Sequence, residues 1–309
     1  MEFFHKVTKV RFMERRKIWY AFSAAMILGS ILLVATRGLN FGIDFTGGVV
    51  IEAGYSGPAD LEATREALAA TGLGAAQVQS FGSASDVLVR LPPATGKEAM
   101  ELTRRATDAI KSVDPAAEIL RSESIGPQVG RELAEKGATA LLMTLLFIGL
   151  YVIMRFQWKF SVGAILAALH DPFVVVGFFS LTQITFDLSV LSAILAVIGY
   201  SLNDTVVVFD RVRERFHSMR KATPVEIMNS AVNETLSRTI MTSFVTLLSV
   251  IVMYFFGGVV MHGFSVAMIV GIVVGTYSSI YIASASALYL GVCREDLLPR
   301  AKETADDRP

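Results

Sequence analysis

Ionisable side chains stand inside segments that are otherwise apolar enough to cross a membrane. Asp204 follows Asn203 near the end of one apolar run. His170 and Asp171 lie in the middle of another, directly before Pro172, where we expect an irregular backbone. A carboxylate in hydrocarbon costs about 2.5–3.5 kcal/mol on insertion scales, so such residues mark ion or proton pathways by default. The four polar residues are therefore candidate members of a proton pathway.

Each candidate also has a plain structural interpretation. Asp204 could be a boundary residue at the inner interface, although aspartate is too short to snorkel well. The His170–Asp171 pair suits a proton relay and equally a buried hydrogen-bonded staple. Arg238 opens the next apolar run. It could be an ordinary anchor at the interface, or its long guanidinium could reach the carboxylate of Asp204.

Helical geometry predicts which way Asp204 points. At about 100° per residue, the run 188–209 divides into two faces. One arc contains Ser189, Ala193, Ala196, Val197, Tyr200, Asn203 and Asp204. The opposite side contains Leu191, Ile194, Leu195, Ile198 and Leu202. Because the second set is purely aliphatic, we expect Asp204 to face protein rather than lipid.

The composition is that of a membrane protein. Hydrophobic residues make up 53% of the 309 and charged residues only 18%, which is too apolar for an ordinary soluble domain of this length. The 28 basic and 28 acidic residues balance, and we expect no nucleic-acid partner. Cys293 is the only cysteine, so neither an internal disulfide nor a cysteine-based metal site can form.

Six apolar runs are long enough to span a bilayer. They cover residues 18–36, 138–154, 160–181, 188–209, 240–256 and 264–292, the last five forming a bundle over 137–292. We interpret the first run as a retained anchor rather than a cleaved signal peptide. It has about 19 residues, more than a typical signal-peptide core, and no small-x-small exit follows it directly.

The positions of Lys and Arg predict the orientation. They gather in the tail 1–17, the turn 155–159, the loop 210–238 and the tail 293–309, whereas the turns 182–187 and 257–263 carry none. By the positive-inside rule the basic segments, including both termini, are cytoplasmic. The segment 37–136 then lies outside, in the periplasm if the membrane is a bacterial inner membrane.

The segment 37–136 has the pattern of a small α+β domain. It contains a strand-like stretch 41–52 interrupted by Gly47-Gly48, a helix 58–70, one or two strands over 77–91, a helix 97–113 and a strand 118–122. This order is close to a ferredoxin-like split βαβ module. No metal cluster, nucleophile elbow or phosphate loop occurs in it. We expect binding or mechanical coupling rather than catalysis, and no cofactor.

Small residues recur at every fourth position in the last apolar run. They are Ala267, Gly271, Gly275, Ser279, Ala283, Ala287 and Gly291. Such a ladder lets two helices approach closely. It fits plain bundle packing and also a sliding interface.

Four motifs, spread over most of the chain, resemble those of the SecF family within the RND superfamily. They are FGIDFTGG (41–48), LHD (169–171), GYSLNDTVVVFDRVRE (199–214) and NETLSRTIMTS (233–243). The resemblance implies a subunit of the SecDF accessory complex, which uses proton motive force to promote late steps of Sec-dependent protein export. It matches Asp204 to the family's intramembrane aspartate and Arg238 to the arginine of its TLSRT motif. Protons, rather than a bound cofactor, would be the coupling ion.

The resemblance also implies partners and a location. RND proteins have twelve spans and two outer domains in two similar halves, and this chain has one half, so SecD is the expected second half. The SecYEG translocon with SecA, YajC and YidC as further candidates, and an unfolded exported polypeptide complete the expected partners. The location would be the cytoplasmic (inner) membrane. Gly42, Asp44, Gly47 and Gly48 look like a hinge or edge strand where the outer domain meets the first span.

Two other interpretations stay open. The chain could be a scaffold that carries no protons and stabilises SecD and the translocon. It could also be a half-size RND exporter, which would need a roomy apolar pocket in the outer domain. An enzyme is not expected, because no catalytic constellation occurs in the sequence.

Overall fold

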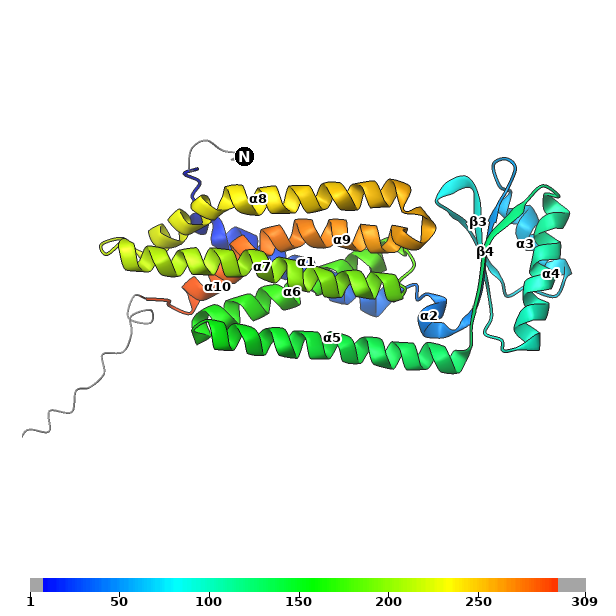
Figure 1. The fold of residues 1–309 in the computed structure, drawn as a ribbon, viewed down its shortest axis with the longest axis horizontal. Helices are drawn as coiled ribbons and strands as arrows, with labels where there is room; N and C mark the ends of the chain where they lie inside the picture. Colours follow the sequence, from blue (N-terminus) through cyan, green and yellow to red (C-terminus); the bar gives the residue numbers. More distant parts are fainter. Residues whose placement is uncertain (1–7, 294–309) are drawn as a thin grey trace, which may run out of the picture.

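The computed structural model describes residues 8–293, apart from the side chain of residue 259. Parts of both predicted tails, residues 1–7 and 294–309, therefore lie outside the described residues. A long helical bundle carries one small α+β domain at one end, with the short helix α2 (Ile43–Thr46) between them (Figure 1). This is the polytopic helical architecture with one ferredoxin-like domain that the sequence predicts.

Six helices in the described part of the chain are long and apolar enough to cross a membrane. They are η1 and α1 (Met13–Arg15 and Arg16–Arg37), α5 (Pro127–Arg155), α6 (Trp158–Thr182), α7 (Leu188–Ser218), α8 (Pro224–Phe256), and α9 (Gly258–Ser278) with its continuation through η2 (Ser279–Ala283) and α10 (Ser284–Tyr289). All six predicted spans are present. Several helices extend beyond the apolar runs because polar turns continue them. α8, for example, starts at a capping box in which Thr223 and Glu226 bond each other's backbone N–H.

The irregular backbone expected before Pro172 is absent from α6. The helix runs unbroken from Trp158 to Thr182 with Pro172 inside it. Proline in a membrane helix is tolerated when neighbouring helices and side chains compensate for the lost backbone bond. Pro172 is buried among such neighbours, which explains why the helix continues.

The small domain has the order β1 (Gly48–Gly54), α3 (Leu61–Ala70), β2 (Gln77–Phe81), β3 (Ser83–Leu91), α4 (Lys97–Val113) and β4 (Glu118–Ile125). Its strands pair antiparallel in the order β2-β3-β1-β4, which is the ferredoxin-like arrangement. The stretch 77–91 forms two strands because Gly82, with φ of 78°, turns the chain between them. β1 is a central strand and begins only at Gly48, so the expected strand over residues 41–47 and the edge-strand interpretation are wrong.

The two faces of the sheet have different roles. Alternate residues of β1, namely Val49, Ile51 and Ala53, enter a core shared with α3 and α4. The other face lies toward the helical bundle and carries Glu52, Arg90 and other charged side chains. Figure 1 shows α3 and α4 on the far side of the sheet from the bundle. A charged surface of the domain therefore meets the ends of the membrane helices.

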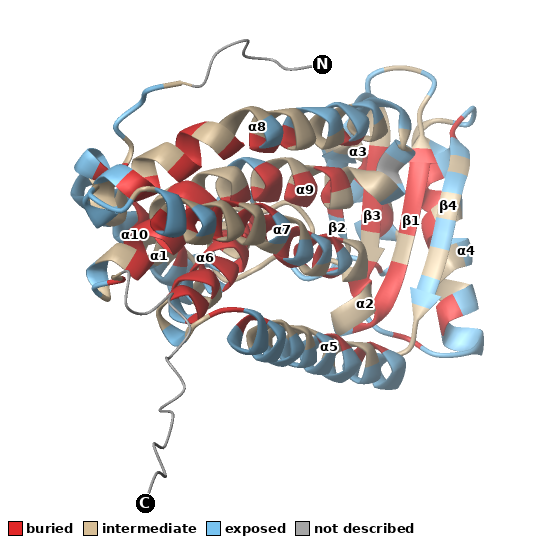
Figure 2. Ribbon diagram, turned by 60° about the vertical axis from the view of Figure 1, so that its left-hand side comes forward, coloured by how far each residue is buried: buried red, intermediate tan, exposed pale blue. Residues whose placement is uncertain are grey.

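Within the bundle, α7 is central and α5 is peripheral. The surface of α5 is largely exposed, whereas α6, α7 and α9 bury much of theirs (Figure 2). α1 lies directly against α6, where a Cβ added to Gly177 would meet Ser30 Oγ at 2.0 Å. The polar candidates at 170, 171 and 204 are thus on the two central helices α6 and α7.

Candidate functional site

Asp204 is buried deep within α7. Its side chain is 2% exposed, and its Oδ2 atom has no hydrogen-bond partner among the described residues. At a rise of 1.5 Å per residue, Asp204 lies about 24 Å along the helix axis from the first residue of α7. It lies about 9 Å before Asp210, which is at the charged inner end of the helix. A carboxyl oxygen that is buried and unsatisfied is costly in either protonation state, which favours a functional over a boundary role.

The predicted division of α7 into two faces is only partly right. Asp204 is buried as expected, but Ala196 and Asn203 are exposed, while Ile194 and Ile198 of the opposite face are buried. The reason is that α6, α8 and α9 surround most of α7. The exposed positions in this part of the helix are Ser192, Ala196, Gly199 and Asn203. This exposed α7 stripe contains only small or polar residues, unlike a surface that faces lipid.

Arg238 lies beside Asp204 without forming an ion pair with it in the described part of the chain. It is exposed and lines a cavity of about 370 Å³ together with Asp210, Glu214 and Glu234. Its positive charge acts on the Asp204 carboxyl from there, and the hydroxyl of Ser243 adjoins the same carboxyl. The predicted direct contact is therefore replaced by a longer-range interaction across the α7–α8 interface.

His170 and Asp171 belong to a second buried polar cluster. His170 Nδ1 and Asp171 Oδ1 are 3.0 Å apart, and both side chains are at most 1% exposed. Asp171 Oδ2 accepts hydrogen bonds from Ser201 Oγ at 2.5 Å and from Ser278 Oγ at 3.0 Å. The four side chains come from α6, α7 and α9, so this polar cluster joins three helices in the middle of the bundle. Sequence reasoning missed its two serines.

The two buried carboxylates differ in their surroundings. Both oxygens of Asp171 are engaged, whereas Asp204 keeps one without a partner. Ser201 precedes Asp204 by one turn on the same buried side of α7. Within α7, the serine that bonds Asp171 is therefore one turn from the unsatisfied carboxyl of Asp204.

Asn233 and Glu234 hold the inner end of the bundle together. The amide of Asn233 accepts from Thr8 Oγ1 at 2.6 Å and from the backbone N–H of Val10 at 2.9 Å, which fixes the described N-terminal segment on α8. Glu234 Oε2 accepts from Nε and Nη2 of Arg215 at 2.9 and 2.7 Å. Asn233 and Glu234 are the first two residues of the NETLSRT motif. Membership of that motif is the sequence feature that could have identified them as functional residues.

The FGIDFTGG segment forms a tight joint between the domain and the bundle. A Cβ added to Gly42 would lie 2.9 Å from Cβ of Asp187, and one added to Gly47 would lie 2.9 Å from Cα of Pro127. Gly47 and Gly48 also have φ values of 70° and 132°, which other residues rarely adopt. The glycines therefore allow three segments to meet at distances that no side chain permits.

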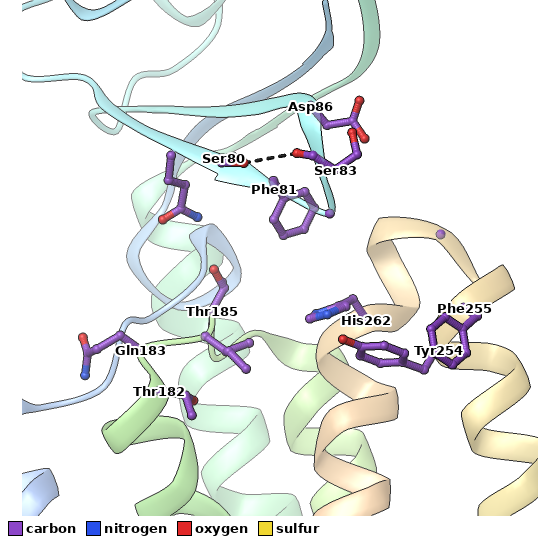
Figure 3. Close-up of a pocket in the computed structure, with 14 residues that line it drawn as sticks. Ser80, Phe81, Ser83, Asp86, Thr182, Gln183, Thr185, Tyr254, Phe255 and His262 are labelled. Carbon is purple, nitrogen blue, oxygen red and sulfur yellow. Dashed lines mark hydrogen bonds between the residues drawn. The ribbon is translucent and has the colours of Figure 1, made fainter. Parts of the chain in front are cut away.

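A cavity of about 620 Å³ separates the β2–β3 hairpin from the nearest helix ends. Figure 3 shows Phe81 and Ser83 of the hairpin on one side, with Tyr254 and His262 on the other. The lining mixes aromatic and polar groups, and the cavity lies beneath the domain rather than inside it. Within residues 8–293, no group of three or more His, Cys, Asp or Glu side chains could hold a metal ion.

Comparison with known proteins identifies the family. The model described as "Protein export membrane protein SecD/SecF, C-terminal" matches residues 105–292, and the model "SecD/SecF GG Motif" matches residues 32–59. The chain belongs to the SecD/SecF family. The motif model covers the residues of the joint described above.

Individual relatives place the chain with SecF. The "Protein translocase subunit SecF" of Pseudomonas aeruginosa is 50% identical over 309 residues, covering 98% of this chain and 99% of that protein. The SecF of Vibrio alginolyticus is 49% identical over 291 residues, covering 94% and 92%. The chain is thus a SecF-type subunit of the protein-export machinery.

A solved structure has the same fold. The crystal structure of SecDF from Thermus thermophilus, described as a translocon-associated membrane protein, matches with a TM-score of 0.83 and 36% identity. A second SecDF structure, in a "Super-membrane-facing form", matches with a TM-score of 0.67. Each match covers 92% of this chain but only 39% of the SecDF chain. This chain thus corresponds to well under half of the solved protein.

Proposed function

We propose that this SecF-type chain uses proton motive force to promote Sec-dependent export, and that Asp204 takes up and releases the proton. The observation that carries the proposal is the burial of Asp204 with one carboxyl oxygen unpartnered. Such a group can gain or lose a proton without first breaking a hydrogen bond at that oxygen. The match of this residue to the family's intramembrane aspartate supports the same role.

Asp204 sits where a small movement changes its preferred charge. Burial favours the neutral carboxyl, and the positive charge of Arg238 favours the ionised form. Because the two residues lie on α7 and α8 without a direct contact, a shift between these helices alters the balance. One charge crossing the membrane supplies about 2.3 kcal/mol per 100 mV, enough to move a two-state equilibrium about fifty-fold. Proton entry then biases the chain toward one of two arrangements.

The His170–Asp171 pair fits a staple better than a relay. Both oxygens of Asp171 are engaged, one by His170 and the other by two serine hydroxyls, in contrast to Asp204. We therefore infer that Asp171 holds α6, α7 and α9 together. Asn203, exposed beside Asp204, is assigned to the surface that meets the partner subunit.

The missing half of the complex is proposed to be SecD. The exposed α7 stripe (Ser192, Ala196, Gly199 and Asn203) is small enough for a second helix to approach closely. A Cβ added to Gly199 has nothing within 4 Å in this chain, which leaves that space open to a partner. SecYEG, SecA, YajC, YidC and the emerging unfolded polypeptide are further proposed partners. The proposed site is the inner membrane, with the ferredoxin-like domain periplasmic and both termini cytoplasmic.

The test is export in cells depleted of their own SecF. Asp204→Asn and Arg238→Met are expected to abolish the stimulation of export at matched membrane levels, with SecD still co-purifying. Glu132→Gln is the matched control, because it neutralises an exposed carboxylate on another membrane helix, α5, that is paired with Lys136. Normal export by Asp204→Asn would contradict the proton role and leave the chain as a scaffold.

The exporter alternative has less support. A half-size exporter of lipids or drugs would need a roomy apolar pocket in the outer domain. The interior of this domain is filled by its own core, and the large cavity beneath it has a mixed aromatic and polar lining.

A further inference from the structure

The joint segment makes a direct contact with the helix that carries Asp204. Asp44 Oδ2 accepts a hydrogen bond from the backbone N–H of Leu188 at 2.9 Å. Leu188 is the first residue of α7, and the same turn is capped by Asp187, which accepts from Val190 N at 2.9 Å. The first N–H groups of a helix have no partner within it, so each needs one from outside. Asp44 provides that partner from a segment 144 residues away.

The segment around Asp44 is fixed on the loop that precedes α7. Gly42 N donates to Phe186 O at 2.8 Å, and Phe186 N donates to Asn40 O at 2.8 Å. The rings of Phe45 and Phe186 lie 6.1 Å apart in the same joint. Only Gly47 stands between the end of α2 and Gly48, the first residue of the central strand β1. A displacement of the α7 N-terminus therefore reaches the sheet through a short, hydrogen-bonded connection.

Arg90 of β3 adds a second attachment on the same side. Its Nη1 donates to Asn40 Oδ1 at 3.0 Å and to Phe41 O at 2.9 Å. Its Nη2 donates to Thr185 Oγ1 at 3.3 Å. Arg90 thus ties the sheet to both chain segments that form the joint.

The domain has clearance on the side of the joint where the β2–β3 hairpin lies. The 620 Å³ cavity lies between the β2–β3 hairpin and the helix ends, with Phe81 and Ser83 facing Tyr254 and His262 across it (Figure 3). A domain that is attached at the joint and has open space under its hairpin can tilt without disrupting its own core. Tilting would open or close this cavity.

We propose that Asp44 is a positioning residue that transmits movement of α7 to the ferredoxin-like domain. The proposal rests on the function given above, because it takes a change of charge at Asp204 as the source of the movement. Movement of α7 carries its capped first turn and the joint with it. The domain then tilts about the joint, and the hairpin moves relative to the ends of α8 and α9.

Distance measurement between spin labels tests the link in the complex with SecD, reconstituted in lipid nanodiscs. Labels at Ser83→Cys and Phe255→Cys flank the cavity, in a Cys293→Ser background. Replacing Asp204 by Asn, which mimics the neutral form, is expected to shift the main distance peak. Asp44→Ala is expected to abolish that shift. Asp44→Asn should retain it, because asparagine caps a helix about as well as aspartate.

Two further variants separate the link from a general loss of structure. Leu188→Pro removes the donor of the same hydrogen bond while Asp44 stays in place, and proline is favoured at the first position of a helix. It is expected to abolish the shift as Asp44→Ala does. Asp60→Ala is the matched control, since Asp60 caps α3 within the domain by accepting from Glu62 N and Ala63 N. It should leave the shift intact.

A shift that persists in both Asp44→Ala and Leu188→Pro would overturn the proposal. So would the absence of any shift on replacing Asp204 when Asp44 is native, because no movement would then reach the domain. The proposed function is judged separately by the export assay. Loss of export in Asp204→Asn without any change in label distance would contradict the coupling through Asp44 but would still support the proton role of Asp204.

Discussion

The polar cluster in the middle of the bundle gives the sharpest test of how the helices are held together. Asp171→Ala removes the acceptor for His170, Ser201 and Ser278 at once, at a site with no exposed surface. His170 is affected most. Its Nε2 already has no hydrogen-bond partner among the described residues, and the substitution would leave both of its ring nitrogens unpaired.

The expected loss of stability follows from the three contacts. Hydrogen bonds between membrane helices contribute about 0.6 kcal/mol on average and about 1.7 kcal/mol at most. Two of the three contacts, from Ser201 and Ser278, join Asp171 to other helices, whereas His170 lies on the same helix. These two contacts therefore stabilise the bundle by roughly 1–3 kcal/mol. We place Asp171→Ala in the upper half of that range, because its three partners stay buried without an acceptor. Asp171→Asn keeps one acceptor oxygen and should cost about half as much.

Thermal unfolding of the purified complex with SecD measures this loss. At about 2 °C per kcal/mol, Asp171→Ala should lower the apparent Tm by about 4 °C or more. Adding Ser278→Ala should cost little further, since its partner is already gone. An Asp171→Ala protein that melts with the wild type would refute the reasoning. If that protein also failed to export, Asp171 would be a proton carrier instead of a staple.

Three other predictions concern the domain, a helix contact and the inner end of the bundle. Burial raises the pKa of Glu52 above its ordinary 4.5, so its contribution to domain stability is full below that pH and is lost as the pH rises through the raised value. Glu52→Gln should therefore slow hydrogen exchange of the β1 amides at pH 8, and equal exchange in both proteins would contradict this. Gly271→Leu should sharply reduce the yield of folded protein in size-exclusion chromatography, because a Cβ at this position would lie 2.2 Å from a valine methyl of α7. Gly29→Leu is the control and should leave the yield unchanged, because a Cβ at Gly29 would have nothing within 4 Å. Glu234→Gln should lower the free energy of unfolding by less than about 1 kcal/mol and reduce its dependence on salt, since the ion pair with Arg215 is partly exposed. A loss of stability that does not depend on salt would argue against the ion pair.

Much of the fold follows from local patterns in the sequence. Hydropathy and length define six spans, and the alternation of strands and helices in 48–125 defines a ferredoxin-like domain. Asp204, His170 and Asp171 stand out because charge is rare inside such runs. These features depend on neighbours within one element, so a single sequence is enough to predict them.

The remaining features depend on which elements meet. The exposure of Asn203 and the burial of Ile198 follow from the helices around α7 rather than from its own periodicity. Asp44 looks like part of a hinge until its contact with Leu188 is known. Ser201 and Ser278 gave no signal of their own, because serine is common in membrane helices and gains significance only beside Asp171. Whether Arg238 is an anchor at the interface or reaches Asp204 depends on the neighbouring helices, and the structure places it in a cavity lined by Asp210, Glu214 and Glu234.

The small-residue ladder of the last span runs through a π-helical turn. From Ala267 to Ala287 the ladder repeats every four residues, and every member is buried. An α-helix turns every 3.6 residues, so such a repeat drifts by about 40° per step and by about 200° over this length. The π-helical turn Ser279–Ala283 accommodates one residue more than an α-helical turn and takes back part of that drift. Deleting one residue there would rotate α10 by about 100°, so the span should accept substitutions at this turn more readily than a change in its length.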